Sequence, residues 1–130
     1  MPATNILANL FTTLYNTEDR RKDSCIIFPT SKLAIEVLNT LKNNGYIKEF
    51  EHIDDNKGGK FVVKLLAKIE KCGAVSPRFK VKKDEYNYWE QRYLPSFNRG
   101  ILLVTTNQGV MSHHEAVNKG IGGFLIGYVY

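Results

Sequence analysis

The polar residues with the clearest chemical potential follow a short apolar run near the end of the chain. Ile101 to Val104 are branched aliphatic residues, and this pattern predicts a buried strand. The next residues, Thr105 to Gln108, carry only hydroxyl and amide groups, and Gly109 after them can adopt backbone angles that other residues avoid. Uncharged donors and acceptors at the end of a strand suit sugar hydroxyls, phosphates and base edges. An ordinary turn would explain the same residues equally well.

A helix is predicted to begin directly after this loop, at Ser112. Ser112 and Glu115 have the Ser-x-x-Glu spacing of a capping box, in which each side chain satisfies a free backbone N–H at the helix start. Capping therefore explains both residues without catalysis. A helix N-terminus beside the polar loop would add free backbone N–H groups, which suit phosphates.

Other candidate sites fail on spacing. His113 and His114 are adjacent, so on a helix they point about 100° apart and cannot share one metal ion without further ligands. Lys57 to Lys60 is similar to a phosphate-binding loop, but Phe61 stands where Ser or Thr must bind magnesium. No nucleophile, base and orienting group form a recognisable arrangement in the sequence. We therefore expect a protein that is not an enzyme and that has no metal site, cofactor or small-molecule substrate.

Composition indicates a globular protein with a polyanionic partner. Of the 130 residues, 43% are hydrophobic, which excludes a disordered chain, and no apolar run approaches the roughly 18 residues of a membrane span. The formal net charge of +5 favours a polyanion without identifying one. No Lys or Arg precedes Arg20, so we expect neither a secretory signal nor a mitochondrial presequence. Cys25 and Cys72 are too isolated for a zinc site and fit the reducing cytoplasm.

The cations lie apart from the polar loop. From Gly100 onward the only charged residues are Glu115 and Lys119. An extended segment before the loop carries a stripe of cations that should project from one side: Arg78, Lys80, Lys82 and Lys83. If the chain binds RNA, the loop must therefore select its target through neutral hydrogen bonds, while cations elsewhere supply nonspecific attraction.

The first half of the chain predicts two helices that cover one face of a sheet. Apolar residues recur at helical spacing from Ile6 to Leu14 and again from Leu33 to Leu41. Thr30 or Ser31 caps the second helix, and Gly45 ends it. Three strands are predicted, at residues 25–28, 46–53 and 61–69, the last two as a hairpin. Together these elements make an α+β layer.

The second half predicts a smaller, mainly β unit. Lys71 to Ser76 is predicted to be a linker, because Gly73 and Pro77 break regular structure. The elements after it are a short helix that Asp84 caps, the strand at 101–104, the helix that begins at Ser112 and a last strand at 124–130. We therefore predict an α+β protein with an N-terminal domain of two helices and three strands at residues 1–73. Residues 74–130 would form the mainly β C-terminal domain with short helices.

Several motifs in a fixed order carry a resemblance to one known family. The run from Gly100 to Ala116 is the longest of them. The others lie along the whole chain: Pro29–Leu33, Gly45–Ile47, Glu49–Glu51, Ile53–Asp55, Lys71–Gly73, Ser76–Phe79 and Gly120–Gly123. In these motifs the chain resembles the universal small-subunit ribosomal protein eight family, called fifteen-a in animals, in its archaeal and eukaryotic branch. The resemblance covers essentially all 130 residues.

The resemblance implies the two-domain fold predicted above and a function in the ribosome. Members of the family bind a bulged stem in the central domain of small-subunit rRNA early in assembly. The resemblance therefore implies a structural component of the small ribosomal subunit, in the cytoplasm, that supports subunit assembly and translation. Its partners would be small-subunit rRNA and neighbouring ribosomal proteins, with no membrane and no small molecule.

The family's RNA contacts carry over to particular residues of this chain. The polar loop would reach sugars and base edges, the start of the second helix would contact phosphate, and two late glycines would allow close approach. With two residues from the cation stripe, the predicted RNA-binding residues are Ser31, Lys32, Arg78, Lys80, Thr105, Thr106, Asn107, Gly109, Gly122 and Gly123. Two residues depart from the family. Asn107 stands where a hydroxyl is common, and Phe124 stands where Glu, Lys or Arg is usual, so we expect no charged RNA contact there.

Two other functions stay open. The aromatic and basic segment from Arg78 to Arg99 would suit a free-standing RNA-binding regulatory protein that holds single strands. A small hydrolase around Ser112 and His114 is the third possibility. Co-sedimentation with small ribosomal subunits through high salt would separate a ribosomal protein from the regulator.

Overall fold

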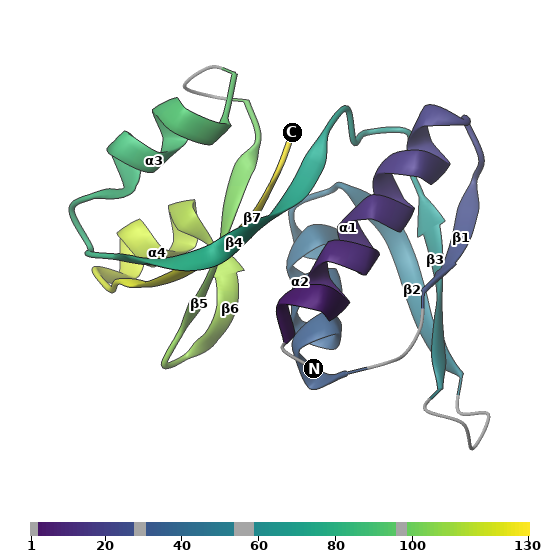
Figure 1. Cartoon of the computed structure of the whole chain (residues 1–130), viewed down its shortest axis with the longest axis horizontal. Helices are drawn as coiled ribbons and strands as arrows, with labels where there is room; N and C mark the ends of the chain where they lie inside the picture. Colours follow the sequence, from purple (N-terminus) through teal and green to yellow (C-terminus); the bar gives the residue numbers. More distant parts are fainter. Residues whose placement is uncertain (1–2, 28–30, 54–58, 96–98) are drawn as a thin grey trace.

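The computed structural model describes residues 3–27, 31–53, 59–95 and 99–130, with the backbone alone at 3–6 and 76–78. In chain order the elements are α1 (Ala3–Asp19), β1 (Ser24–Ile27), α2 (Lys32–Asn43), β2 (Ile47–Ile53), β3 (Lys60–Leu65), β4 (Cys72–Val81), α3 (Tyr86–Tyr93), β5 (Ile101–Thr106), β6 (Gly109–Ser112), α4 (His113–Lys119) and β7 (Gly123–Val129). Helices are interspersed among the strands of two antiparallel sheets (Figure 1), so the predicted α+β class is confirmed. In the described ranges no helix is long and apolar enough to span a membrane.

The first sheet has three strands in the order β1-β3-β2, and α1 and α2 pack against it. The helical stripes predicted from the sequence lie in the core. Every described apolar residue of these stripes except the half-buried Leu33 and Ile35 is at most 1% exposed: Leu7, Leu10, Phe11, Leu14, Ala34, Val37, Leu38 and Leu41. On the sheet side, Phe61 and Val63 of the central strand are fully buried. The amphipathic spacing of both helices therefore fixes which face meets the sheet.

The ends of α2 follow the predicted signals. Ser31 is the N-cap, and its Oγ accepts a hydrogen bond from the backbone N–H of Ala34 at 3.1 Å. At the other end Asn44 is the C-cap, and Gly45 follows with a φ of 81°, which a residue without a Cβ adopts readily. Both ends of this helix are thus determined by local sequence.

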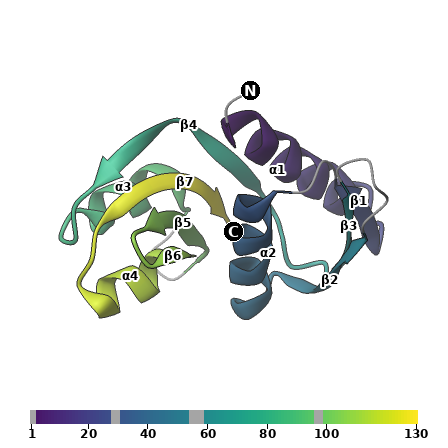
Figure 2. The same ribbon diagram turned by 90° about the horizontal axis from the view of Figure 1, so that it is seen from below.

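The second sheet has four strands in the order β4-β7-β5-β6. One face carries α3 and α4 over a core that includes Leu102, Val104 and Leu125. The opposite face packs on the first unit, because Leu103 and Ile126 belong to the same core as α1 and α2. Figure 2 shows α2 between the two sheets. This packing holds the two units against each other through apolar contact.

The predicted linker at 71–76 is wrong, because β4 begins at Cys72 within it. Cys72 pairs with Val129 and Gly73 pairs with Tyr128, so the segment is a strand of the second sheet. Cys72 also packs under α1, where its Sγ lies 3.3 Å from the carbonyl oxygen of Phe11. A Gly and a Pro look like breakers in sequence, but a partner strand more than 50 residues away decides the structure here. The division at residue 73 stays a prediction about independent domains.

Two element boundaries also differ from those predicted. The strand β3 ends at Leu65 rather than Ile69, and Ala67 shortly after it has a φ of 58°, which breaks the extended backbone. The helix α3 has Glu85 as its N-cap residue, not Asp84, and no side chain caps it. Instead, Glu85 Oε1 accepts the backbone N–H of Lys82 at 2.8 Å. The predicted strand at 25–28 is present as β1, while Phe28 and Thr30 lie outside the described residues.

Candidate nucleic-acid interface

The polar loop is the turn of a β-hairpin. β5 extends through Thr105 and Thr106, and the chain returns as β6, with Thr106 paired to Gly109. Only Asn107 and Gln108 lie outside the strands. The expectation that the loop leads directly into a helix is therefore wrong. The strand β6 separates them, and Ser112 at its end pairs with Leu103, well away from the turn.

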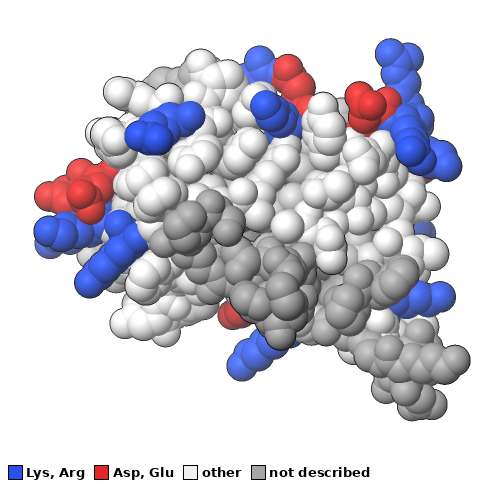
Figure 3. Space-filling view, in the orientation of Figure 1, with Lys and Arg blue, Asp and Glu red and all other residues white. Residues whose placement is uncertain are grey.

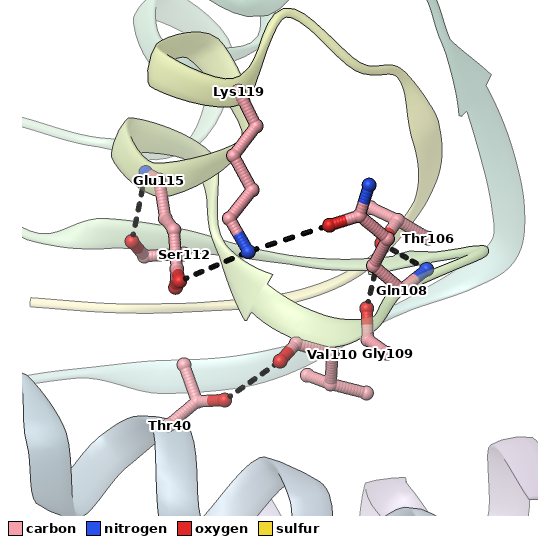
Figure 4. A network of polar contacts seen from close by, with 8 residues as sticks. All are labelled: Thr40, Thr106, Gln108, Gly109, Val110, Ser112, Glu115 and Lys119. Carbon is pink, nitrogen blue, oxygen red and sulfur yellow. Dashed lines mark hydrogen bonds and ion pairs between the residues drawn. The ribbon is translucent and has the colours of Figure 1, made fainter.

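The side chain of Thr106 fixes the conformation of this turn (Figure 4). Its hydroxyl accepts the backbone N–H of Gln108 at 3.0 Å and donates to the carbonyl of Gly109 at 2.9 Å. Gly109 has a φ of 107°, so the expectation that a glycine is needed here is confirmed. Thr106 thus has a structural role, and its hydroxyl keeps one lone pair free to accept a bond from a ligand.

The two turn residues present their amides to solvent. Asn107 and Gln108 are exposed, and within the described part of the chain the Asn107 amide has no hydrogen-bond partner. Gln108 Oε1 lies 3.4 Å from Lys119 Nζ, which in turn lies 3.6 Å from Glu115 (Figure 4). The sequence-based prediction omitted Gln108 from the RNA-binding residues. Its place beside Asn107 in a two-residue turn makes it a further candidate.

Ser112 has the predicted capping role. It is 4% exposed, and its Oγ accepts the backbone N–H of Glu115 at 3.3 Å at the start of α4. Gly120 ends the same helix in the left-handed conformation. A buried hydroxyl that already accepts a helix N–H is poorly placed to act as a nucleophile, and this disfavours the hydrolase.

His113, His114 and Glu90 lie together, with one ligand atom of each within 4.8 Å of the others. His113 Nδ1 accepts the backbone N–H of Leu102 at 2.9 Å, so its Nε2 must carry a proton, which it donates to the carboxylate of Glu90. A metal ion would need the Nε2 lone pair, which this tautomer does not have. Burial first, and then the neighbouring His114, hold the pKa of His113 below its ordinary value, although Glu90 opposes this shift. The group is therefore a structural link between α3, α4 and β5.

The helix α2 runs beside the hairpin. The Thr40 hydroxyl lies 3.2 Å from the carbonyl oxygen of Val110, and a Cβ added to Gly109 would come within 3.1 Å of Glu36 Oε1. In Figure 1 the N-terminal end of α2 and the hairpin turn lie on the same, lower side of the molecule. Ser31 is the N-cap at this end of α2, and Lys32 in its first turn is exposed.

The predicted cations and late glycines meet at the end of the second sheet. Lys80 is exposed on β4, and Lys82 and Lys83 follow that strand; the side chain of Arg78 lies outside the described residues. A Cβ on Gly122 would overlap the carbonyl oxygen of Val81, and one on Gly123 would overlap that of Thr105. Both glycines are thus required for close backbone packing within the protein, whether or not RNA approaches them.

The face seen in Figure 3 carries few charges near its centre, so far as the described residues show, and most Lys and Arg side chains lie around its outline. The competing single-strand model needs aromatic side chains that are free to stack on bases, but most of those described between residues 78 and 99 pack within the protein. Trp89 stacks on Phe79 and Tyr93 with ring centroids 4.8 and 6.3 Å apart, and among the described aromatic residues of this segment only Tyr88 is largely exposed, at 56%.

Comparison with known proteins decides the family. The family model described as Ribosomal protein S8 matches residues 5–130. The chain belongs to this family. It is 78% identical over 130 residues to the small ribosomal subunit protein uS8 of Nitrosopumilus maritimus (strain SCM1), with both chains covered in full. It is 75% identical over 130 residues to that of Cenarchaeum symbiosum (strain A), again over the full length of both.

The prediction placed the chain in the archaeal and eukaryotic branch of the family, and these archaeal matches confirm the branch. They also confirm the prediction of a non-enzymatic component of the small ribosomal subunit, located in the cytoplasmic ribosome. As a small-subunit protein, the chain has rRNA and other ribosomal proteins as partners.

Proposed function

We propose that the chain binds the central domain of small-subunit rRNA through the hairpin turn of the second sheet, and so supports subunit assembly and translation. The observation that carries the proposal is a turn that the protein itself holds in shape and that exposes two amides. Thr106 fixes the turn from inside, the exposed Asn107 amide has no hydrogen-bond partner in the described part of the chain, and the exposed Gln108 contacts only Lys119 through its side-chain oxygen. A preformed turn loses little entropy on binding, so its hydrogen bonds contribute to affinity and selectivity.

The surrounding cations supply the second part of the proposed interface. Lys80, Lys82 and Lys83 lie at the end of β4, and Lys32 lies in the first turn of α2. A cation in the first turn opposes the helix dipole, and a phosphate beside it would offset that cost. We assign these residues to phosphates and the turn to sugars and bases, with Thr105, Gly109, Gly122, Gly123, Ser31 and Arg78 completing the proposed RNA-binding set.

A pair of double variants tests the proposal. Changing Asn107 and Gln108 to Ala removes amides that would be buried against RNA, at about 1–3 kcal/mol for each unsatisfied partner, so affinity for a central-domain rRNA transcript should fall at least tenfold. The matched control changes the exposed residues Asn87 and Gln91 of α3 to Ala. Neither pair carries charge, so the dependence of affinity on salt should not change.

Two outcomes of these binding measurements would contradict the proposal. Thermal melts must first show that both double variants fold as the parent does. If the turn variant then binds the transcript as tightly as the parent and the control, the hairpin turn is not the reading site. If the parent itself prefers the transcript no more than an unrelated duplex, the proposed function fails as a whole.

A further inference from the structure

Phe124 is a large apolar side chain that the protein's own core does not use. It is 46% exposed, whereas Leu125 beside it is fully buried. Phe124 belongs to neither hydrophobic cluster, and within the described part of the chain no aromatic ring packs against it. In the sequence this position stood out only because it lacks the charge that is usual in the family. In the structure, the residues around Phe124 form an environment that suits a phenyl ring.

The register of the second sheet places Phe124 between two predicted RNA-binding residues. Phe124 on β7 pairs directly with Lys80 on β4 and with Thr105 on β5. Directly paired residues of antiparallel strands project from the same face of a sheet. The side chain of Phe124 therefore projects between those of Lys80 and Thr105, on the face opposite to α3 and α4.

A shallow hollow adjoins the ring. Its volume is about 520 Å³, and its lining residues are Lys80, Val81, Lys82, Lys83, Asp84, Gly120, Gly122, Gly123 and Phe124. Three of these residues are Lys and one is Asp, so the rim is cationic, while the exposed ring of Phe124 gives apolar surface. The hollow thus offers an apolar face within reach of several positive charges.

We propose that Phe124 is a stacking site for one unpaired nucleobase of the bound RNA, with the phosphates on either side of that base held by Lys80 and its neighbours. A base needs an apolar face together with cations for its flanking phosphates, and the hollow supplies both. Charge complementarity selects RNA over an apolar protein segment, which would bury the lysines without partners. This inference rests on the proposed function and deepens it, because Thr105 connects the stacking site to the hairpin.

The first experiment compares substitutions that change the π surface and keep the fold. Phe124→Leu keeps an apolar side chain but has no aromatic face, and Phe124→Trp enlarges the face. Stacking on an aromatic side chain typically changes affinity by about 5- to 150-fold per base, so Phe124→Leu should weaken binding to the central-domain transcript within this range. Phe124→Trp should bind at least as tightly as the parent. The slope of affinity against salt should stay constant in both variants.

The second experiment identifies the base. Each unpaired nucleotide of the transcript is replaced in turn by an abasic one. At a single position this replacement should lower the affinity of the parent, while Phe124→Leu should bind that abasic transcript as tightly as it binds the intact one. Tyr88→Leu is the matched control, because Tyr88 is also exposed but lies on α3. It should bind every transcript as the parent does.

The outcomes separate this inference from the function it rests on. If Asn107→Ala, Gln108→Ala weakens binding while Phe124→Leu binds as the parent does, the stacking site is wrong and the reading hairpin stands. A weakening in Phe124→Leu that no abasic position abolishes would also overturn stacking. If the parent does not prefer the central-domain transcript, both proposals fall together. Thermal melts of Phe124→Leu and Phe124→Trp that match the parent exclude a folding defect.

Discussion

A buried hydrogen bond, 2.9 Å long, joins the backbone N–H of Leu102 to Nδ1 of His113 beneath α3 and α4. This bond holds α4 to β5 and fixes the tautomer, so that Nε2 can donate to Glu90 of α3. His113 can make both of these hydrogen bonds only while its ring is neutral. A proton added to Nδ1 would remove the acceptor that Leu102 needs.

Stability should therefore fall on acidification. The pKa of His113 lies below its ordinary value of 6.5 in the folded state, so near pH 6 and below the unfolded chain binds more protons at this residue than the folded chain does. The contribution is fully present above about pH 7 and is lost as the pH falls through 6.5 toward the lowered folded pKa. Urea unfolding at a series of pH values from about 7.5 to about 5 measures this.

Two histidine variants assign the acid effect. His113→Gln should remove this part of the pH dependence, although the variant will be less stable than the parent at neutral pH. The exposed His52 on β2 is the control, and His52→Gln should keep the slope of the parent. An identical pH dependence in His113→Gln and the parent would mean that another group titrates.

The hydroxyl of Thr106 should contribute to stability as well as to the site. Thr106→Val keeps the shape but removes the bonds to Gln108 and Gly109, and the unfolding free energy should drop by about 1 kcal/mol. Thr106→Ser should recover most of this stability. Thr12→Val on the exposed face of α1 is the matched control and should change little. Equal stability of the Thr106→Val and Thr12→Val proteins would show that the turn does not depend on this hydroxyl.

Gly123 should not tolerate a side chain. A Cβ there would overlap the carbonyl oxygen of Thr105 and come within 2.9 Å of Val104, so Gly123→Ala should force β5 and β7 apart. The expected decrease in unfolding free energy is about 1–3 kcal/mol. Gly45→Ala has open space around the new methyl group, so its only cost comes from its φ of 81°. Chemical denaturation of both variants checks the packing, which would be contradicted if Gly123→Ala were the milder change.

The Lys residues at the end of β4 should contribute to RNA binding through their charge alone. Changing Lys80, Lys82 and Lys83 together to Gln should weaken binding to rRNA and to unrelated duplex alike. The salt slope should flatten by roughly 0.7–0.9 for each phosphate that the variant no longer neutralises. The control changes the exposed Lys48, Lys64 and Lys68 to Gln, which alters the net charge equally. If both triple variants show the same slope, the end of β4 does not face RNA.

Cys72 should behave as a buried thiol. Burial, and then the nearby Glu18, raise the pKa of Cys72 to about 12, so its reactive thiolate is scarce at neutral pH. Iodoacetamide at mildly alkaline pH should label Cys72 in the unfolded chain and scarcely at all in the native one. Chelators and reductants should leave the melting temperature unchanged. A drop of several degrees with EDTA would reveal a metal site.

The sequence by itself determined the features that depend on neighbouring residues. The apolar stripe from Leu33 to Leu41, the cap at Ser31 and the stop at Gly45 all depend on interactions within a few residues, and each was predicted correctly. The same holds for the cap at Ser112. Capping and helical periodicity are local effects, so a single sequence contains them in full. The family motifs and the neutral polar loop were also visible at this level.

Only the tertiary structure decided the features that depend on pairing between distant strands. Val110 and Met111 are too short a run to predict β6, and it exists because it pairs with β5 across the turn. The segment at Cys72 is a strand because β7 lies beside it, and His113 is a link because Glu90 comes from another helix. Phe124 lies between Lys80 and Thr105 only in the register of the second sheet. Strand register is set by contacts across long sequence separations, and no local pattern encodes it.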